Sequence, residues 1–286
     1  MPRIKLVTDS SADIPEPLAR QLGITVVPLS VVASALPVPS SPFSADLLRR
    51  GARQNIPAVR VAPPSIEEFT NTYRSLRDSC DGILSVHVSS KWSEVISNAL
   101  IAREAFGPIG KGGPFPIMVA DSASFTMGLG WIVLALARAA SSEQLDLARL
   151  ARMAARLSEQ AHVAFFVEHI DYLVRGGPGA RLIPQVDSLA SAKPLLHLDE
   201  GQVTVYEKTR TRAKARDALY NFVEDFPKIG ELAVFHTGAQ NDVEHLLTRI
   251  GAIYQRERVL ILQPGPAVSA WLGPEAVGVA VLEGEE

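Results

Sequence analysis

The sequence holds one cysteine, few aromatic residues and no excess of basic charge. Cys80 alone cannot form an internal disulfide framework or a cysteine-rich metal site, and a lone cysteine is most often a small buried apolar residue. The 286 residues carry 28 basic and 31 acidic side chains, a formal charge of −3. This balance provides no basic footprint for nucleic acid or for an anionic membrane. We therefore expect no nucleic-acid partner.

Long apolar runs that could cross a membrane are also missing. The uncharged stretch 122–137 contains serine, threonine and glycine, and it falls short of the roughly 20 apolar residues of a membrane span. The opening Met-Pro-Arg-Ile-Lys leads into a short apolar segment, without the hydrophobic region or cleavage site of a signal peptide. These features predict no membrane span and a cytoplasmic location.

The first half of the chain has an α/β pattern. Short apolar runs at residues 4–7, 24–27, 83–88 and 117–120 alternate with longer segments of helical period, including expected helices at 93–106, 128–140 and 142–157. This alternation is typical of βαβ units and a mostly parallel sheet. Three of the strands end in polar residues, at 8–11, 89–93 and 121–124. Such ends meet at the carboxyl edge of a parallel sheet, where ligands usually bind.

Beyond His162 the pattern becomes mixed. Residues 163–167 predict a strand, 175–180 a loop, and 195–198 with 202–206 a hairpin about Asp199-Glu200-Gly201. Helices are expected at 211–222 and 242–252, and strands at 232–235 and 259–262. At roughly 150 residues per domain, the length favours two domains. We expect an α/β fold with a parallel-sheet N-terminal domain at 1–160 and a mixed-sheet C-terminal α/β domain at 161–286.

No catalytic signature is present in the sequence. Gly-x-Ser-x-Gly does not occur, and Gly107-Pro108-Ile109-Gly110-Lys111-Gly112 lacks the spacing of a phosphate loop. The six histidines have no zinc-site spacing, so we expect no metal and no cofactor. Asp9 follows the first strand and is either a catalytic or binding carboxylate or a helix N-cap, a role open to Ser10 as well. These features favour a small-molecule binding protein over an enzyme.

Short motifs run in order through nearly the whole chain. They include Val7-Thr8-Asp9-Ser10-Ser11, Pro64-Ser65 with Glu68-Phe69, Val88-Ser89-Ser90-Lys91-Trp92-Ser93, Ala120-Asp121-Ser122, Tyr172-Leu173-Val174-Arg175-Gly176-Gly177, Ala192-Lys193-Pro194 and Lys208-Thr209-Arg210-Thr211. Each motif alone is weak evidence, but the series resembles the DegV family, the fatty-acid-binding proteins that serve as the carrier subunit of bacterial fatty acid kinase.

The resemblance implies two α/β domains with a long-chain fatty acid, such as palmitate, between them. The acyl chain would occupy an apolar tunnel and polar residues would hold the carboxylate. Burying one methylene contributes about 0.8 kcal/mol, so sixteen carbons could contribute on the order of 10 kcal/mol before ordering costs. A closed tunnel can therefore hold a lipid without covalent chemistry.

The residues that match the family's carboxylate site have partly changed. The family's threonine and its neighbour correspond to Val61 and Ala62, which lack a hydroxyl group. Ser93 matches the family's serine, whereas Glu94 stands where the family has glycine. An acidic Glu94 would disfavour an anionic head group unless it points to solvent or is protonated.

Two basic or polar family positions have also changed. The family arginine corresponds to Pro178, with Arg175 or Arg181 as possible substitutes in other positions, and the family histidine corresponds to Trp271. The resemblance implies a fatty acid kinase as partner, but the changes at Pro178 and Trp271 argue against this partnership.

Four interpretations remain open. The leading one is a non-enzymatic fatty-acid binder in which Ser93 and the backbone N–H groups of a helix start receive the carboxylate. A second is a binder of a neutral-head lipid without a kinase partner, for which Val61 and Trp271 are suitable and Glu94 could accept a hydrogen bond. A third is a small-substrate enzyme using Asp9, Ser10 or Ser93, which needs a general base such as Glu94 or a histidine. The fourth is a relic that binds nothing specific.

Overall fold

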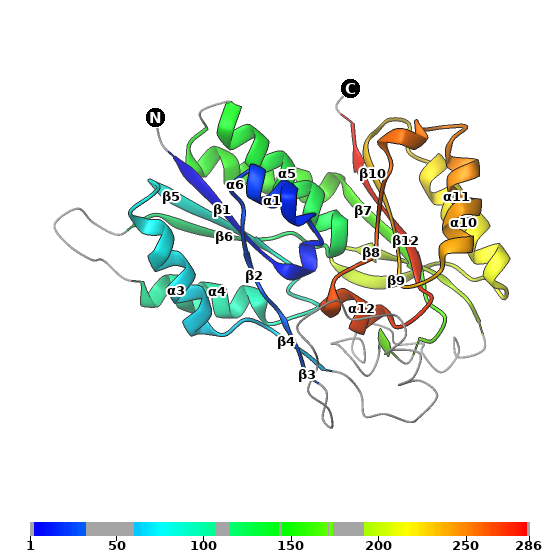
Figure 1. The fold of residues 1–286 in the computed structure, drawn as a ribbon, viewed down its shortest axis with the longest axis horizontal. Helices are drawn as coiled ribbons and strands as arrows, with labels where there is room; N and C mark the ends of the chain where they lie inside the picture. Colours follow the sequence, from blue (N-terminus) through cyan, green and yellow to red (C-terminus); the bar gives the residue numbers. More distant parts are fainter. Residues whose placement is uncertain are drawn as a thin grey trace. The chain divides into compact units, whose positions relative to one another are not determined.

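The computed structural model describes residues 3–32, 60–106, 115–142, 145–170, 172–173 and 192–284 (Figure 1). The chain divides into two compact units, Met1–Ser30 with Ala62–Gln160, and Val31–Val61 with Ala161–Glu286. Among the described residues, the second unit thus includes 31–32 and 60–61 as well as those beyond 160, and two independent domains at 1–160 and 161–286 stay a prediction. The predicted loop at 175–180, with Arg175 and Pro178, and Arg181 lie outside the described residues, as do residues 107–114.

The first unit is built on a four-stranded sheet in the order β2-β1-β5-β6. The strands β1 (Ile4–Asp9), β2 (Thr25–Val27), β5 (Gly82–His87) and β6 (Ile117–Asp121) all pair in parallel. All six residues of β5 are buried, as expected for a central strand covered on both faces. The parallel-sheet half of the predicted fold is confirmed.

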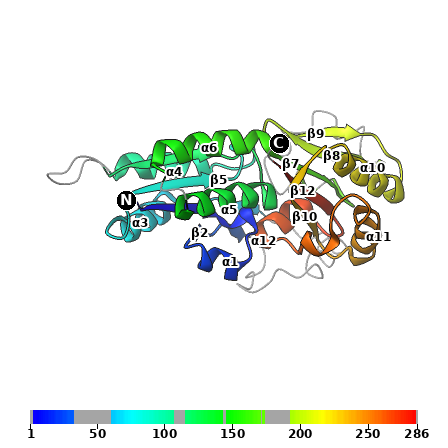
Figure 2. The ribbon, with the colours of Figure 1, turned by 90° about the horizontal axis from the view of Figure 1, so that it is seen from above.

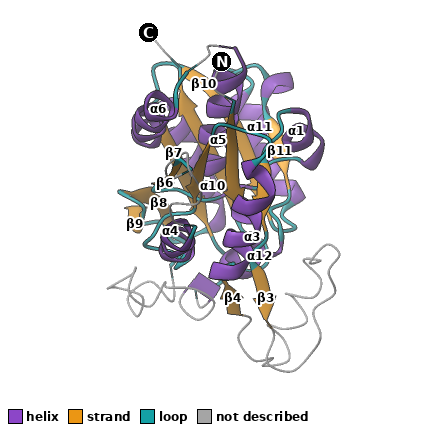
Figure 3. Cartoon of the chain, turned by 90° about the vertical axis from the view of Figure 1, so that its left-hand side faces the viewer, coloured by secondary structure: helices purple, strands orange, loops and turns teal. Residues whose placement is uncertain are grey.

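Helices cover both faces of this sheet. The helices α3 (Ile66–Arg77) and α4 (Val95–Ala105) pack together on one face, and α5 (Thr126–Ser142) and α6 (Leu147–Gln160) pack together on the other (Figure 2). In Figure 3, β6 lies between α4 and α6. A short 3-10 turn, η1 (Ser10–Ala12), and the helix α1 (Glu16–Gln21) connect β1 to β2.

The helix α5 is apolar on all sides, and every residue from 126 to 134 is buried. Gly130 allows its close approach to η1, because a Cβ atom at this position would lie 2.6 Å from the Ala12 carbonyl oxygen. The predicted helix at 142–157 instead begins at Leu147. The Asp146 carboxylate accepts a hydrogen bond from the Arg149 N–H at 2.7 Å and so caps the helix at this point.

The second unit has a six-stranded mixed sheet in the order β11-β10-β12-β7-β8-β9. Its strands are β7 (Ala161–Phe166), β8 (Leu195–Asp199), β9 (Gln202–Glu207), β10 (Ile229–His236), β11 (Leu260–Leu262) and β12 (Val277–Glu283). Among the described strands of this six-stranded sheet, only β10 and β11 pair in parallel. The predicted hairpin is confirmed, and its turn residues Glu200 and Gly201 have φ angles of 46° and 77°.

The helices α10 (Arg212–Glu224) and α11 (Gln240–Ile250) lie side by side on this sheet and bury an aliphatic and aromatic cluster against it (Figure 1). A 3-10 turn, η2 (Arg256–Arg258), precedes β11, and α12 (Pro266–Leu272) precedes β12. The short strands β3 (Ser30–Val32) and β4 (Arg60–Ala62) pair with each other. None of the described helices is long and apolar enough to span a membrane.

Candidate functional site

Asp9 ends β1 and Ser10 begins η1, and both side chains form hydrogen bonds within the protein. The Asp9 carboxylate is fully buried, and its Oδ1 accepts hydrogen bonds from Ser11 N at 3.0 Å and Ser11 Oγ at 2.5 Å. Asp9 therefore caps η1, which was one of its two expected roles. Ser10 Oγ accepts a hydrogen bond from Leu29 N at 2.9 Å and holds the segment after β2. Direct ligand contact by either residue stays a prediction.

The second oxygen of Asp9 reaches the end of β5. Oδ2 lies 2.9 Å from Val88 N, which donates to it, and 3.0 Å from His87 Nδ1. On the other side of the imidazole ring, His87 Nε2 lies 2.6 Å from Ser85 Oγ, to which the Tyr73 hydroxyl donates at 3.0 Å. These four side chains are fully buried and join β1, β5 and α3.

Tyr73, Ser85, His87 and Asp9 form one continuous series of hydrogen bonds. With Asp9 as a carboxylate and His87 as a neutral imidazole, Nδ1–H donates to Asp9 and Nε2 accepts a hydrogen bond from the Ser85 hydroxyl. The Ser85 oxygen in turn accepts a hydrogen bond from the Tyr73 hydroxyl. Burial raises the pKa of Tyr73 to about 12, so this hydroxyl stays a donor at neutral pH.

The segment 88–93 follows β5 and is tied to the turn after β6. Ser89 N donates to Ser124 O at 2.9 Å, and Ser90 N donates to Asp121 Oδ2 at 3.1 Å. The Trp92 ring stacks on Phe125 with 4.3 Å between the ring centroids. The predicted convergence of three polar strand ends is therefore present in the first unit, and it fixes the path of this segment.

Ser93 ends this segment just before α4. Its backbone N–H donates to Ser89 O at 3.3 Å, whereas its half-buried side-chain hydroxyl has no hydrogen bond with any residue that the structure describes. Glu94 is the N-cap residue of α4, is exposed, and makes no capping hydrogen bond with its side chain. The first N–H groups of α4 thus have no partner from this cap, and the positive end of the helix dipole lies next to Ser93.

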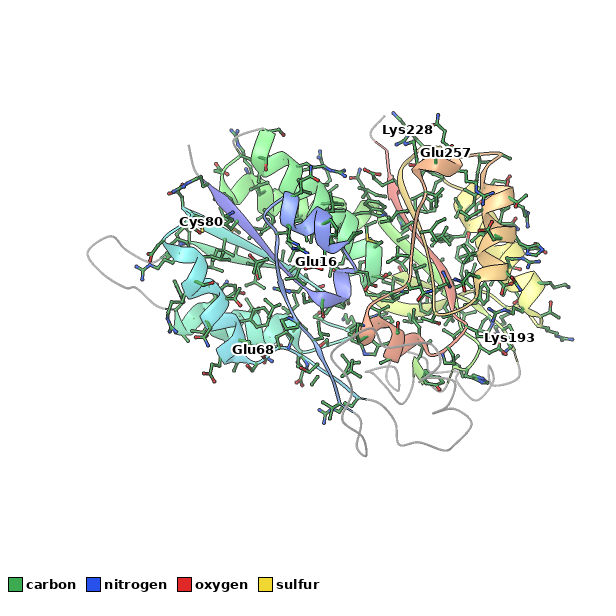
Figure 4. All side chains as sticks on the ribbon, in the orientation of Figure 1. Glu16, Glu68, Cys80, Lys193, Lys228 and Glu257 are labelled. Atoms are coloured by element: carbon green, nitrogen blue, oxygen red, sulfur yellow. The ribbon has the colours of Figure 1, made fainter. Side chains whose placement is uncertain are left out.

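Val61 and Ala62 end β4 and are both half-buried. From Ala62 the chain runs to α3, whose start carries a reciprocal capping box between Ser65 and Glu68, the latter labelled in Figure 4. Asn98 of α4 donates to the Pro64 carbonyl at 2.8 Å and ties this segment to the helix that follows Ser93. These hydrogen bonds hold the segment between Ala62 and α3 against the first unit.

Trp271 belongs to the second unit, whereas Asp9, Ser10, Ala62, Ser93 and Glu94 belong to the first. Trp271 lies on α12 and is only 2% exposed. The turn after α12 is held by Thr237, whose Oγ1 donates to Gly273 O at 2.6 Å and accepts from Ala276 N at 2.8 Å.

An ion-pair network supports the same turn of the second unit. Arg212 donates to the Glu275 carbonyl at 2.8 Å and pairs with Glu168 and Asp242. Lys193, labelled in Figure 4, pairs with Glu168 at 2.7 Å. Partial burial alone would raise the pKa of Glu168. The positive charges of Lys193 and Arg212 outweigh this effect and hold the pKa below its usual value.

The sequence is similar to known proteins over nearly its whole length. The family model described as "Uncharacterised protein, DegV family" matches residues 3–284. The chain belongs to the DegV family. A DegV domain-containing protein of Streptomyces coelicolor is 31% identical over 97% of this chain and 98% of its own, and one of Caldanaerobacter subterraneus is 30% identical over 98% of each.

Solved DegV structures share the fold over the full length. A Thermus thermophilus DegV family protein described for fatty acid binding superposes with a TM-score of 0.84 at 26% identity, covering 98% of this chain and 99% of that one. DegV of Bacillus subtilis, described as a fatty acid binding protein, has a TM-score of 0.85 at 23% identity over 99% and 100% of the two chains. The DegV resemblance and the predicted fold class are confirmed.

Sequence reasoning missed His87, Tyr73 and Asn98. Ser85 and His87 are two residues apart in the otherwise apolar strand β5 and therefore lie on the same face of the sheet. This pattern could have indicated a buried polar pair. Nothing local indicated their partners Asp9 and Tyr73. Among the described residues, no group of histidine, cysteine and carboxylate side chains could hold a metal ion.

Proposed function

We propose that this protein binds a long-chain fatty acid of the palmitate type without catalysing a reaction on it. Its acyl chain would occupy an apolar tunnel, and its carboxylate would lie near Ser93. The observation that carries the proposal is the half-buried Ser93 hydroxyl, which has no hydrogen bond within the described residues and precedes an uncapped helix. Such a helix start favours an anion.

Two further observations support this assignment. The exposed Glu94 points its charge to solvent, which was the condition for an anionic head group beside it. Fatty acid binding is also the described property of the Thermus thermophilus protein at 26% identity. The roles of Val61, Ala62 and Trp271 as apolar lining, and a cytoplasmic location, remain parts of the proposal.

Lipid extraction tests the proposal. Organic extract from the purified protein, analysed by mass spectrometry, should contain fatty acid at one equivalent per chain. Ser93→Ala removes the one side-chain hydroxyl assigned to the carboxylate, so palmitate affinity should fall on the order of tenfold to a hundredfold. Ser97→Ala, the same change at an exposed position of α4, is the matched control and should retain the lipid. Equal lipid in both variants would refute the role of Ser93, and no lipid and no palmitate uptake would refute the function.

A neutral-head lipid is the second candidate. It is favoured by the apolar Val61 and by Trp271, which is 2% exposed. Competition between palmitate and the fatty alcohol of equal length decides between the two. Tighter binding of the alcohol would support the neutral head and would also remove the chemical basis for a kinase partner, because an acyl phosphate requires a carboxylate.

The enzymatic alternative requires a base at Ser93. No histidine or carboxylate in the described part of the chain is hydrogen-bonded to Ser93 Oγ, and the buried Asp9 and His87 bond to each other. We therefore propose a carrier, and expect bound palmitate to be recovered chemically unchanged after prolonged incubation.

A further inference from the structure

Asp9 connects two segments that are far apart in sequence. One of its oxygens holds η1 through Ser11, and the other accepts the backbone N–H of Val88. Val88 is the first residue of the segment that ends at Ser93. The carboxylate therefore sets where this segment leaves the sheet.

His87 adds a second connection to the same point. Its Nδ1 lies 3.0 Å from Asp9 Oδ2, and its ring is held from behind by Ser85 and packed edge-on against Phe69 at 5.1 Å. The imidazole thus orients the carboxylate toward Val88, in the way that outer hydrogen-bond partners orient functional groups elsewhere.

We propose that Asp9 and His87 are positioning residues, which set the geometry of segment 88–93 and through it the placement of the Ser93 hydroxyl. This inference rests on the proposed binding of a fatty acid at Ser93. It assigns Asp9 a role different from direct ligand contact, since its two oxygens already serve Ser11 and Val88.

The substitution Asp9→Asn is a sharp probe because it keeps the shape of the side chain. Whichever way the amide turns, its NH₂ group faces a backbone N–H, that of Ser11 or that of Val88. One of the two segments then loses its acceptor. The His87→Gln substitution removes the ring while leaving Asp9 bonded to Val88, so its effect should be smaller in the same direction.

Two measurements separate positioning from general stability. Hydrogen exchange of the amides in segment 88–93 is followed in the ligand-free protein, and palmitate affinity is measured at a temperature where every variant is folded. Leu246→Ala is the control, because Leu246 is fully buried in the cluster of the second unit and its truncation lowers stability without touching the first-unit network.

Asp9→Asn should speed exchange in segment 88–93 and weaken palmitate binding about tenfold, the effect of one charge-assisted hydrogen bond. Leu246→Ala should change neither readout. Wild-type exchange and affinity in Asp9→Asn, with a stability loss like that of Leu246→Ala, would overturn the inference. If Asp9→Asn does not fold, His87→Gln is judged by the same two readouts. Failure of the wild type to bind palmitate would refute the proposed function, while the exchange data would still decide the positioning role.

Discussion

Replacing Gly130 by alanine sets two opposing effects against each other in α5. Alanine is favoured over glycine in a helix interior by about 1 kcal/mol. The new Cβ atom, however, would lie 2.6 Å from the Ala12 carbonyl oxygen and 2.8 Å from Met127 Sδ. The sulfur can move by side-chain rotation, but the carbonyl belongs to the backbone of η1. Overpacking of this kind costs about 1–3 kcal/mol, so we expect a net loss of about 1 kcal/mol and a Tm lower by a few degrees.

Thermal unfolding of Gly130→Ala beside Gly251→Ala measures this balance. Gly251 follows α11 with a φ angle of −57°, and a Cβ atom there would meet its nearest atom, Leu247 O, at an ordinary 3.5 Å. The control substitution should leave Tm unchanged or raise it slightly, because alanine lowers the entropy of the unfolded chain. A Tm of Gly130→Ala at or above that of the wild type would show that η1 is not packed against α5 as described.

Two further predictions concern the second unit. Ion pairing lowers the pKa of Glu168, and burial lowers the pKa of His197. As pH falls, both groups therefore bind protons in the unfolded chain before they do so in the folded protein. The stability of the folded protein is lost as pH falls through the two folded-state pKa values. Denaturant unfolding between neutral and acid pH should show this fall, and Glu168→Gln should flatten its most acidic part; an unaltered slope would contradict the pairing. Thr237→Val leaves Gly273 O and Ala276 N without their buried partner and should cost about 1–3 kcal/mol in urea unfolding, whereas a neutral result would mean that solvent replaces the hydroxyl.

Local patterns predicted the elements whose causes are local. The hairpin turn was predictable because Gly201, which has a φ angle of 77°, supplies a left-handed conformation that glycine adopts without strain. The convergence of the polar strand ends was predictable because parallel strands end at the same edge of a sheet. The start of α6 was placed too early, because the capping side chain of Asp146 decides it and the apolar period does not.

Long-range contacts were beyond any local pattern. Asp9 and His87 are 78 residues apart, and Asn98 and Pro64 are 34 apart, so no spacing rule pairs them. The capping role of Asp9 was foreseen as one of two alternatives, but its second oxygen on Val88 required the fold. The site roles of Ser93, Val61 and Trp271 stay predictions until a ligand is measured.

The position of β12 has a consequence for how the second unit assembles. This strand follows every other described strand in sequence, yet it lies in the sheet between β10 and β7 and pairs with both. During synthesis, β7, β8 and β9 can form only one fragment of the sheet, and β10 and β11 another. The edges of β7 and β10 stay open until residues 277–283 leave the ribosome, and in that interval they can pair with foreign strands. Formation of the complete sheet is therefore a late event with high contact order, and the nascent chain is most exposed to aggregation just before it.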